Sequence, residues 1–511
     1  MVSLAVVLVA SVFARQMDRV ASTDPAQCQS VYDSKVIQLI YETPLNIDYY
    51  ARPYKLVPGA CELPEVSADG LTYIFRVRDD AARPESAPYR IAASDIVRSL
   101  ERLRDPEIVS PNGWYLKSVD TIKALDDKTV EIRMKRRQHV FPWIMAMSGC
   151  GIMKEDGSGT GPFELTKWWK NHEMVFKRRS EEVRGKSEEL RSGKFFDTVK
   201  FLVIDDMSTQ WLMFLNGELD VLGEISQDNW DAVVDKDGNL SPDLVKAGVK
   251  MYSMPTLSVM YVGLNMKDPV LGNNKKLRQA LNAAFDFDAW NRFYCNRAVE
   301  AGGPVPPTVE SALPAETFKY RFNLELAKKL IAEAGYPDGV DPKTGRRLVL
   351  TMSMGRASQD ARERAELMAS FYEKIGVKLE TQFYTWDAFM KAVNEGRTQM
   401  YQMGWVGDYP DAENFLQLFH SSNVSPGANH SCYVNPEYDR AYDAAMAATT
   451  EEERNRYWRE CQEIVREDCP WIYTHVPKSN SLVRPSVGNY IPSDFPYGQE
   501  AYLEVRGKSE E

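Results

Sequence analysis

An aspartate that closely follows an apolar strand pattern is the side chain whose type and position most clearly suggest chemistry. The segment from Gln399 to Trp405 has the pattern of a strand, and Asp408 follows its carboxyl end. Ligand clefts of α/β sheets form at the carboxyl ends of strands, so we predict that Asp408 binds a ligand. The alternative is that Asp408 shapes the turn of the Asp-Tyr-Pro-Asp segment, as Asp411 is expected to do.

Three residues of the preceding strand are further candidates for ligand contact. Met403 and Gly404 can offer backbone hydrogen-bonding groups, and a glycine allows a ligand to approach the chain closely. Trp405 either forms the floor of a cleft or packs into the core, since a large aromatic ring suits both positions.

The sequence carries no catalytic or cofactor motif. It lacks a Gly-x-Gly-x-x-Gly before a helix, a phosphate-binding loop, a His-Glu-x-x-His pair and a Gly-x-Ser-x-Gly elbow. The glycine-rich run 157–162 ends in a proline and has no lysine at the phosphate-binding position, so we interpret it as a turn. The five histidines are scattered and the seven cysteines contain no Cys-x-x-Cys pair, which disfavours a metal site. We therefore predict no catalytic residue, no metal, no cofactor, and a binding protein rather than an enzyme.

The elements that would position these residues alternate between strand and helix. From 347 to 405 the pattern predicts strand 348–352, helix 361–375, strand 377–383, a helix capped by Thr385, and strand 399–405. This order folds as right-handed crossovers on a mostly parallel sheet. Another helix is predicted from Asn323, as its N-cap, to Gly335. The fold class is therefore α/β.

Length and charge exclude some classes of function. A chain of 511 residues is long enough for more than one lobe, and its 44% hydrophobic and 26% charged residues are typical of a soluble globular protein. The net charge of −11 argues against nucleic acid as the main partner, because phosphate binding needs a basic surface.

The chain begins with an apolar run, MVSLAVVLVASVFA, of signal-peptide length. Val12 and Ala14 suit the small-residue rule for cleavage, although no lysine or arginine precedes the run; the alternative is a buried strand. No later stretch approaches ~18 uninterrupted apolar residues, so no membrane span is predicted. An exported chain could form one or more disulfides, and an odd number of cysteines leaves at least one free thiol.

Eight segments, in order along nearly the whole chain, resemble the family 5 bacterial extracellular solute-binding proteins. The sequences LAKKLIAEAGYPDG and GWVGDYPD are the most specific of them. The segments are Arg90–Arg104, Gly159–Thr166, Phe214–Leu222, Leu277–Phe287, Ala301–Thr308, Asn323–Val340, Met403–Gln417 and Tyr433–Met446.

This resemblance implies a type II periplasmic-binding-protein fold, with two α/β lobes, a two-strand hinge and an extra subdomain on the first lobe. Residues 1–22 would hold the signal peptide and the start of the mature chain. Subdomain I of lobe 1 would comprise 23–45, 162–262 and 478–505, subdomain II would comprise 46–161, and lobe 2 would comprise 263–477.

The resemblance also implies a function: capture of small peptides, dipeptides or oligopeptides, by closure of the lobes, for an ATP-driven importer. Asp408 occupies the place of the family aspartate that contacts the peptide's α-ammonium. Arg356 lies in a segment similar to one in which dipeptide-binding members carry an arginine that clamps the ligand carboxylate; the alternative is a surface arginine.

The partners implied are a small peptide and the membrane permease subunits, for a monomer in the periplasm or cell envelope. Two other classes remain open. The same fold could bind a non-peptide solute, such as a glycan, a murein fragment, haem or a nickel complex. A chaperone or adhesin-like interaction protein could also use an aromatic cleft.

Overall fold

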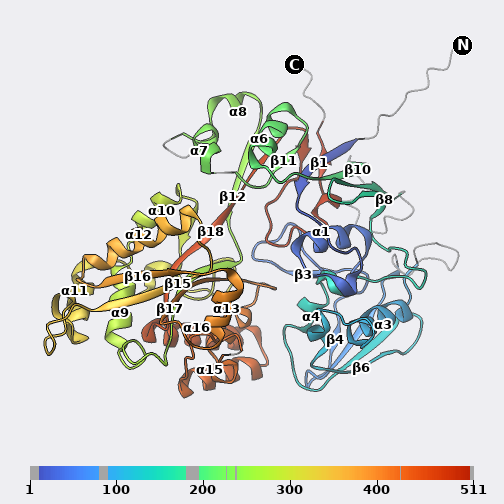
Figure 1. The fold of residues 1–511 in the computed structure, drawn as a ribbon. Helices are drawn as coiled ribbons and strands as arrows, with labels where there is room; N and C mark the ends of the chain where they lie inside the picture. The colour runs from blue at the N-terminus through green and yellow to red at the C-terminus, as the bar shows by residue number, and fades with distance from the viewer. Residues whose placement is uncertain are drawn as a thin grey trace, which may run out of the picture. The chain divides into compact units, whose positions relative to one another are not determined.

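The chain forms two compact units in a computed structural model that describes residues 11–79, 90–179, 195–225, 227–235, 239–425 and 427–506 (Figure 1). Unit 1 comprises residues 1–254 and 479–511, and unit 2 comprises residues 255–478. The chain passes from one unit to the other within two strands, β12 (Lys250–Pro255) and β18 (Trp471–Val483), and these strands pair with each other.

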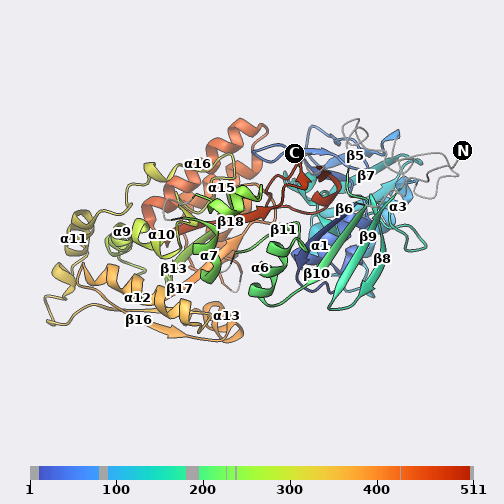
Figure 2. The same ribbon diagram turned by 90° about the horizontal axis from the view of Figure 1, so that it is seen from above.

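Unit 1 contains two main sheets. In the larger, β1 pairs in parallel with β10 and β11, and β10, β9 and β8 follow one another as antiparallel neighbours, which lie side by side in Figure 2. The smaller has the order β4-β5-β7-β6 and is antiparallel throughout. The described strands and α-helices are β1 (Val12–Met17), α1 (Val31–Ile40), β2 (Leu45–Ile47), β3 (Leu56–Pro58), β4 (Glu65–Val66), β5 (Thr72–Arg76), α3 (Ala93–Glu101), β6 (Val119–Ala124), β7 (Thr129–Met134), α4 (Phe141–Ile144), β8 (Phe163–Trp169), β9 (Glu173–Arg178), β10 (Thr198–Val203), α6 (Met207–Asn216), β11 (Val221–Leu222), α7 (Gln227–Val233), α8 (Pro242–Lys246), β19 (Val487–Gly488) and β20 (Glu504–Val505).

The end of the amino-terminal apolar run is a sheet strand. Strand β1 pairs with β10 from Val12 to Met17, and Phe13 within it is fully buried. Residues 12–17 form a strand, which fits the alternative interpretation, and cleavage directly after Ala14 would cut this strand in two. The rest of the run, residues 1–10, lies outside the described residues, and a signal peptide there stays a prediction.

Unit 2 is built on a mixed sheet with the order β16-β15-β17-β13-β18, and β14 also pairs with β18. Helices lie along this sheet in Figure 1. The described strands and α-helices are β13 (Ser258–Leu264), α9 (Lys275–Ala284), α10 (Phe287–Phe293), β14 (Ala298–Glu300), α11 (Leu324–Glu333), β15 (Val349–Met354), α12 (Gln359–Glu373), β16 (Lys378–Phe383), α13 (Trp386–Asn394), β17 (Met400–Val406), α14 (Glu413–Leu416), α15 (Pro436–Ala447) and α16 (Glu451–Asp468).

Short 3-10 helices connect several of these elements in both units. They are Pro25–Gln27, Arg102–Arg104, Gly113–Leu116, Ser148–Cys150, Ala315–Thr317, Pro337–Gly339, Gln417–Phe419, Ser421–Asn423 and Gln499–Ala501.

The predicted β-α-β-α-β unit is confirmed, with β16 and β17 on opposite sides of β15 and both parallel to it. The parallel arrangement ends at β17, because β13 and then β18 are antiparallel neighbours. Thr385 stands at the N-cap of α13 as predicted, but its side chain makes no capping hydrogen bond. Asn323 caps α11 by accepting a hydrogen bond from the backbone N–H of Leu326.

Aromatic side chains fill the core of unit 2. Tyr261 of β13 stacks on Trp471 of β18 with ring centroids 3.4 Å apart and ring planes 3° from parallel. Much of the aromatic content of unit 2 therefore serves packing. Its fully buried aromatic residues include Trp290, Trp458, Trp471, Tyr261, Tyr372, Tyr401 and Tyr438.

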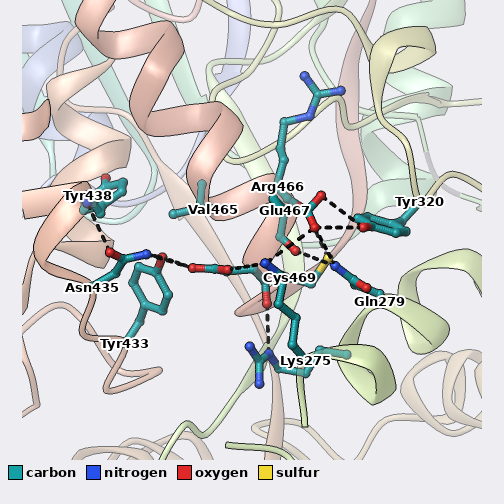
Figure 3. Close-up of polar contacts among 12 residues, drawn as sticks. Lys275, Gln279, Tyr320, Tyr433, Asn435, Tyr438, Val465, Arg466, Glu467 and Cys469 are labelled. Atoms are coloured by element: carbon teal, nitrogen blue, oxygen red, sulfur yellow. Dashed lines mark hydrogen bonds and ion pairs between the residues drawn. The ribbon is translucent and has the colours of Figure 1, made fainter. Parts of the chain in front are cut away.

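An acid cluster, Glu467 and Asp468, ends helix α16 and ties it to its neighbours (Figure 3). Asp468 accepts hydrogen bonds from the Tyr433 hydroxyl (2.6 Å) and the Asn435 amide (2.9 Å), and Lys275 forms an ion pair with it at 2.9 Å. Two acids at a helix C-terminus oppose the helix dipole, so these partners are needed to hold them there.

Two further features concern the environment in which the chain could work. All seven cysteines are free thiols. Among the described residues, none of the helices combines the length and apolar character that crossing a membrane requires.

Candidate ligand-binding site

Among the described residues, strand β17 has a strand partner on only one side near its carboxyl end, which leaves the other edge open to pairing. On the side of β13, its pairing continues to Ser258↔Val406, whereas on the side of β15 it stops at Ser353↔Tyr401. Residues 402–406 therefore extend beyond the β15 ladder. An extended ligand backbone can add to a strand edge of this kind, with hydrogen bonds that do not depend on its side chains.

Asp408 lies just beyond this edge, in the loop after β17. The residue is exposed, but the surrounding protein desolvates its carboxyl group and raises the pKa of that group. A hydrogen bond from the Nδ2 of Asn414 to Oδ2 of Asp408, at 3.2 Å, opposes that rise. A carboxylate that is both accessible and partly desolvated can bind a cationic group strongly.

Trp405 belongs to the same cluster as Asp408. Its indole Nε1 donates a hydrogen bond to Oδ1 of Asn414 at 2.8 Å, and the residue is half-buried. The structure thus brings Trp405 and Asp408 together through one side chain, Asn414, which is 1% exposed. Sequence reasoning did not identify Asn414, although it lies three residues after the Gly-Trp-Val-Gly-Asp-Tyr-Pro-Asp segment that drew attention to Asp408.

The loop that carries Asp408 is held by helices α14, α15 and α16. Asp411 forms an ion pair with Arg454 of α16 at 2.9 Å. Glu413 of α14 accepts hydrogen bonds from the hydroxyls of Tyr409 and, at 3.0 Å, Tyr442 of α15. Desolvation raises the pKa of Glu413, and the nearby Asp411 adds to the rise. The predicted structural role of Asp411 is consistent with its ion pair.

Acidic groups outnumber basic ones in this region. Asp408, Asp411 and Glu413 occur within six residues of sequence, and Arg454 neutralises Asp411. The remaining charge favours a ligand with a cationic group at Asp408.

Met403 and Gly404 lie on the strand itself. Met403 is buried and pairs with Tyr261 of β13, and Gly404 pairs with Met260. A Cβ atom at Gly404 would come within 2.4 Å of the Met260 Sδ atom, so a larger residue here would require the Met260 side chain to move. Their predicted ligand contacts therefore concern the backbone groups alone.

Arg356 lies on the loop between β15 and α12, with its side chain exposed. Because β15 and β17 are parallel, Arg356 and Asp408 follow strands that end toward the same edge of the sheet. Arg356 attracts Asp360 at the start of α12 electrostatically and helps to lower the pKa of that carboxyl group. The carboxylate clamp stays a prediction.

The site has the parts of a binding site for an extended, cationic ligand. It combines an accessible carboxylate, an indole and an open strand edge. Among the described residues, the side chains of histidine, cysteine, aspartate and glutamate form no group of three or more that could hold a metal ion.

Comparisons with known proteins point to one family. Residues 55–427 match the model described as "Bacterial extracellular solute-binding proteins, family 5 Middle". Heme-binding protein A of Haemophilus influenzae is 27% identical over 488 residues, which cover 88% of this chain and 84% of that protein. The dipeptide-binding protein of Escherichia coli is 23% identical over 502 residues, which cover 90% of this chain and 88% of that protein.

The fold is also that of solved structures. The structure of HbpA2 from Haemophilus parasuis matches with a TM-score of 0.83 at 23% identity, over 97% of this chain and 99% of that one. This likeness confirms the predicted fold class, the two-lobed α/β fold of periplasmic binding proteins.

Proposed function

Because the chain belongs to the family 5 bacterial extracellular solute-binding proteins, which serve ABC importers, we propose that it captures small peptides for such an importer. It would work outside the cytoplasm, as a monomer, and deliver its ligand to the permease subunits in the membrane. The observation that supports peptides most directly is the accessible, partly desolvated carboxylate of Asp408 beside the open edge of β17.

Each part of the site corresponds to a part that all peptides share. The α-ammonium of a peptide, with a pKa of ~7.7–8.0, is mostly charged at neutral pH and can pair with Asp408. The amide groups of the peptide can bond to the backbone of β17 at Met403 and Gly404. A hydrogen bond that involves a charged group contributes ~1.5–3 kcal/mol, so the ammonium contact would supply much of the affinity.

A second candidate ligand is haem, because the relative at 27% identity is named Heme-binding protein A. Haem is a planar dianion at neutral pH and has no ammonium group. The excess of acidic side chains around Asp408 therefore disfavours it at this site.

Native mass spectrometry of the protein purified from its host separates these candidates. We expect bound masses that match peptides and disappear after partial unfolding and dialysis. A Soret absorption band, with one haem mass per chain, would overturn the peptide proposal. A library of di- to hexapeptides added to the stripped protein should then raise its melting temperature, because the ligand binds the folded state. No shift with any peptide would also contradict the proposal.

A further inference from the structure

One buried amide bonds both side chains that are predicted to contact the ligand. We infer that Asn414 is a positioning residue: it fixes the Asp408 carboxylate and the Trp405 indole as a single unit, and so makes the site selective for ligands with a primary ammonium group. The inference rests on the proposed function, since it assigns how the same site would distinguish an amine from other solutes.

The hydrogen bonds of Asn414 fix its orientation. Its Oδ1 accepts from Trp405 Nε1 at 2.8 Å and from the backbone N–H of Asp408 at 3.3 Å, while its Nδ2 donates to Asp408 Oδ2 at 3.2 Å. A flipped amide would place an N–H against two other N–H donors. Both ends of the amide are therefore used, and each orients a different part of the site.

The neutral charge of the amide matters as much as its geometry. An arginine or lysine at this place would also orient Asp408, but it would cancel the negative charge and repel an incoming ammonium. The contrast is present in the same loop, where Arg454 neutralises Asp411 at 2.9 Å. Asn414 thus orients a carboxylate and leaves its charge available.

The backbone of Asn414 is anchored independently of the ligand. Its N–H donates to the carbonyl of Asp411 at 3.2 Å, and the Asp411 side chain accepts from the N–H of Glu413 at 2.9 Å. Arg454 and Tyr442 hold these two acids from α16 and α15. Side chains supported in this way keep the geometry that selective binding requires.

The ionisation of Asp408 gives a consequence that a purely structural role would not have. The titratable or charged groups of this region are Asp411, Glu413, Tyr409, Tyr442 and Arg454, and the group that acts directly on Asp408 is Asn414. Its hydrogen bond favours the ionised carboxyl group. Loss of that bond should move the ionisation of Asp408, and with it amine binding, to higher pH.

The test compares Asn414→Leu with Asn429→Leu, a matched loss of a buried amide in unit 2. Asn429 is fully buried and bonds to the backbone of His420 and Tyr433. The probes are a casein hydrolysate and the same hydrolysate after N-acetylation, titrated by thermal shift. Asn414→Leu should weaken binding of the free-amine mixture by about fivefold or more, while the control keeps its affinity. Binding of the acetylated mixture, already weak, should not change between the variants.

The outcomes separate the inference from the proposed function. If the unmodified protein does not bind the hydrolysate, the proposed function fails and the inference fails with it. If it binds and Asn414→Leu binds equally well, the inference alone is wrong.

A second readout needs no ligand and uses Asn414→Asp, which keeps the shape of the side chain. The difference in fluorescence between each protein and its Trp405→Phe counterpart is followed against pH. Two adjacent carboxyl groups cannot both ionise easily. The pH at the midpoint of the fluorescence change should therefore be higher in Asn414→Asp than in the unmodified protein. An unchanged midpoint would contradict the coupling of Trp405, Asn414 and Asp408.

Discussion

Two acidic sites in unit 2, the acid cluster at the end of α16 and Asp408, place an aspartate carboxyl group in different environments. In the acid cluster at the end of α16, Asp468 has a lysine, a tyrosine and an asparagine as partners. Desolvation acts to raise its pKa, but these hydrogen bonds outweigh it and hold the pKa below its usual value. At Asp408 the partner is a single amide, and desolvation raises the pKa.

The difference separates an acid that holds the fold from an acid that is available to a ligand. Asp468 is satisfied by its own protein, and an added cation would find its oxygens occupied by Tyr433, Asn435 and Lys275. Asp408 lacks a cationic partner among its described contacts and is exposed. We therefore expect changes at Asp468 to alter stability and changes at Asp408 to alter binding.

The largest expected effect is on stability, at the acid cluster. Asp468→Ala removes the carboxylate that binds Lys275, Tyr433 and Asn435. It should therefore lower the free energy of unfolding by about 3 kcal/mol. Asp408→Ala should change it by about 1 kcal/mol or less, because the residue is exposed and loses one hydrogen bond, from Asn414. Calorimetry on both variants measures the contrast. Equal losses would remove the distinction between the two acids.

The next effect is that ionisation of the two acids changes the free energy of unfolding in opposite directions as the pH rises. The pKa of Asp468 is lower in the folded state, so its stabilisation is present above the unfolded pKa of ~3.9 and is lost as the pH falls through the folded value. The pKa of Asp408 is higher in the folded state, so its ionisation lowers stability as the pH rises between the unfolded and folded values.

Urea unfolding of Asp468→Asn and Asp408→Asn, from about pH 3 to pH 7, checks these signs. Relative to the unmodified protein, Asp468→Asn should lose stability as the pH rises, and Asp408→Asn should gain it. If the stability of both variants changed in the same direction as the pH rises, the environment of Asp408 would be less desolvated than its raised pKa implies.

The smallest effect on stability is expected at Arg356, which is exposed. Arg356→Ala should alter the free energy of unfolding by less than about 0.5 kcal/mol. If Arg356 clamps the ligand carboxylate, affinity should peak at one peptide length, because each added residue extends the chain by ~3.3 Å. The variant should then flatten the profile of a two- to six-residue series measured by calorimetry. An identical profile would make Arg356 a surface residue.

Much of the fold could be predicted because its signals are local. The periodic patterns between residues 348 and 405 gave the strands and helices that place Asp408 at the end of β17. The apolar run at the amino terminus was ambiguous, since a signal segment and a buried strand have the same composition. The pairing of β1 with β10, almost two hundred residues away, could not be foreseen from the composition of this run.

The parts that could not be predicted depend on side-chain geometry. An asparagine six residues after Asp408 has no pattern that distinguishes it from a surface residue, and its bonds to Trp405 and Asp408 require the turn between them. The partners of Asp468 come from α9 and from the segment before α15, which are distant in sequence. The sequence predicts that Gly404 admits a ligand, but it gives no sign that the Met260 side chain of β13 lies against this glycine.

The most direct test of the central claim is a thermodynamic cycle between one side chain and one ligand group. Calorimetry would measure the unmodified protein and Asp408→Asn against a free-amine casein hydrolysate and its N-acetylated form. If Asp408 binds the peptide ammonium, the substitution and the acetylation should each weaken binding about tenfold or more, and together hardly more than either alone. Free and acetylated peptides that bind the unmodified protein equally well would contradict the claim.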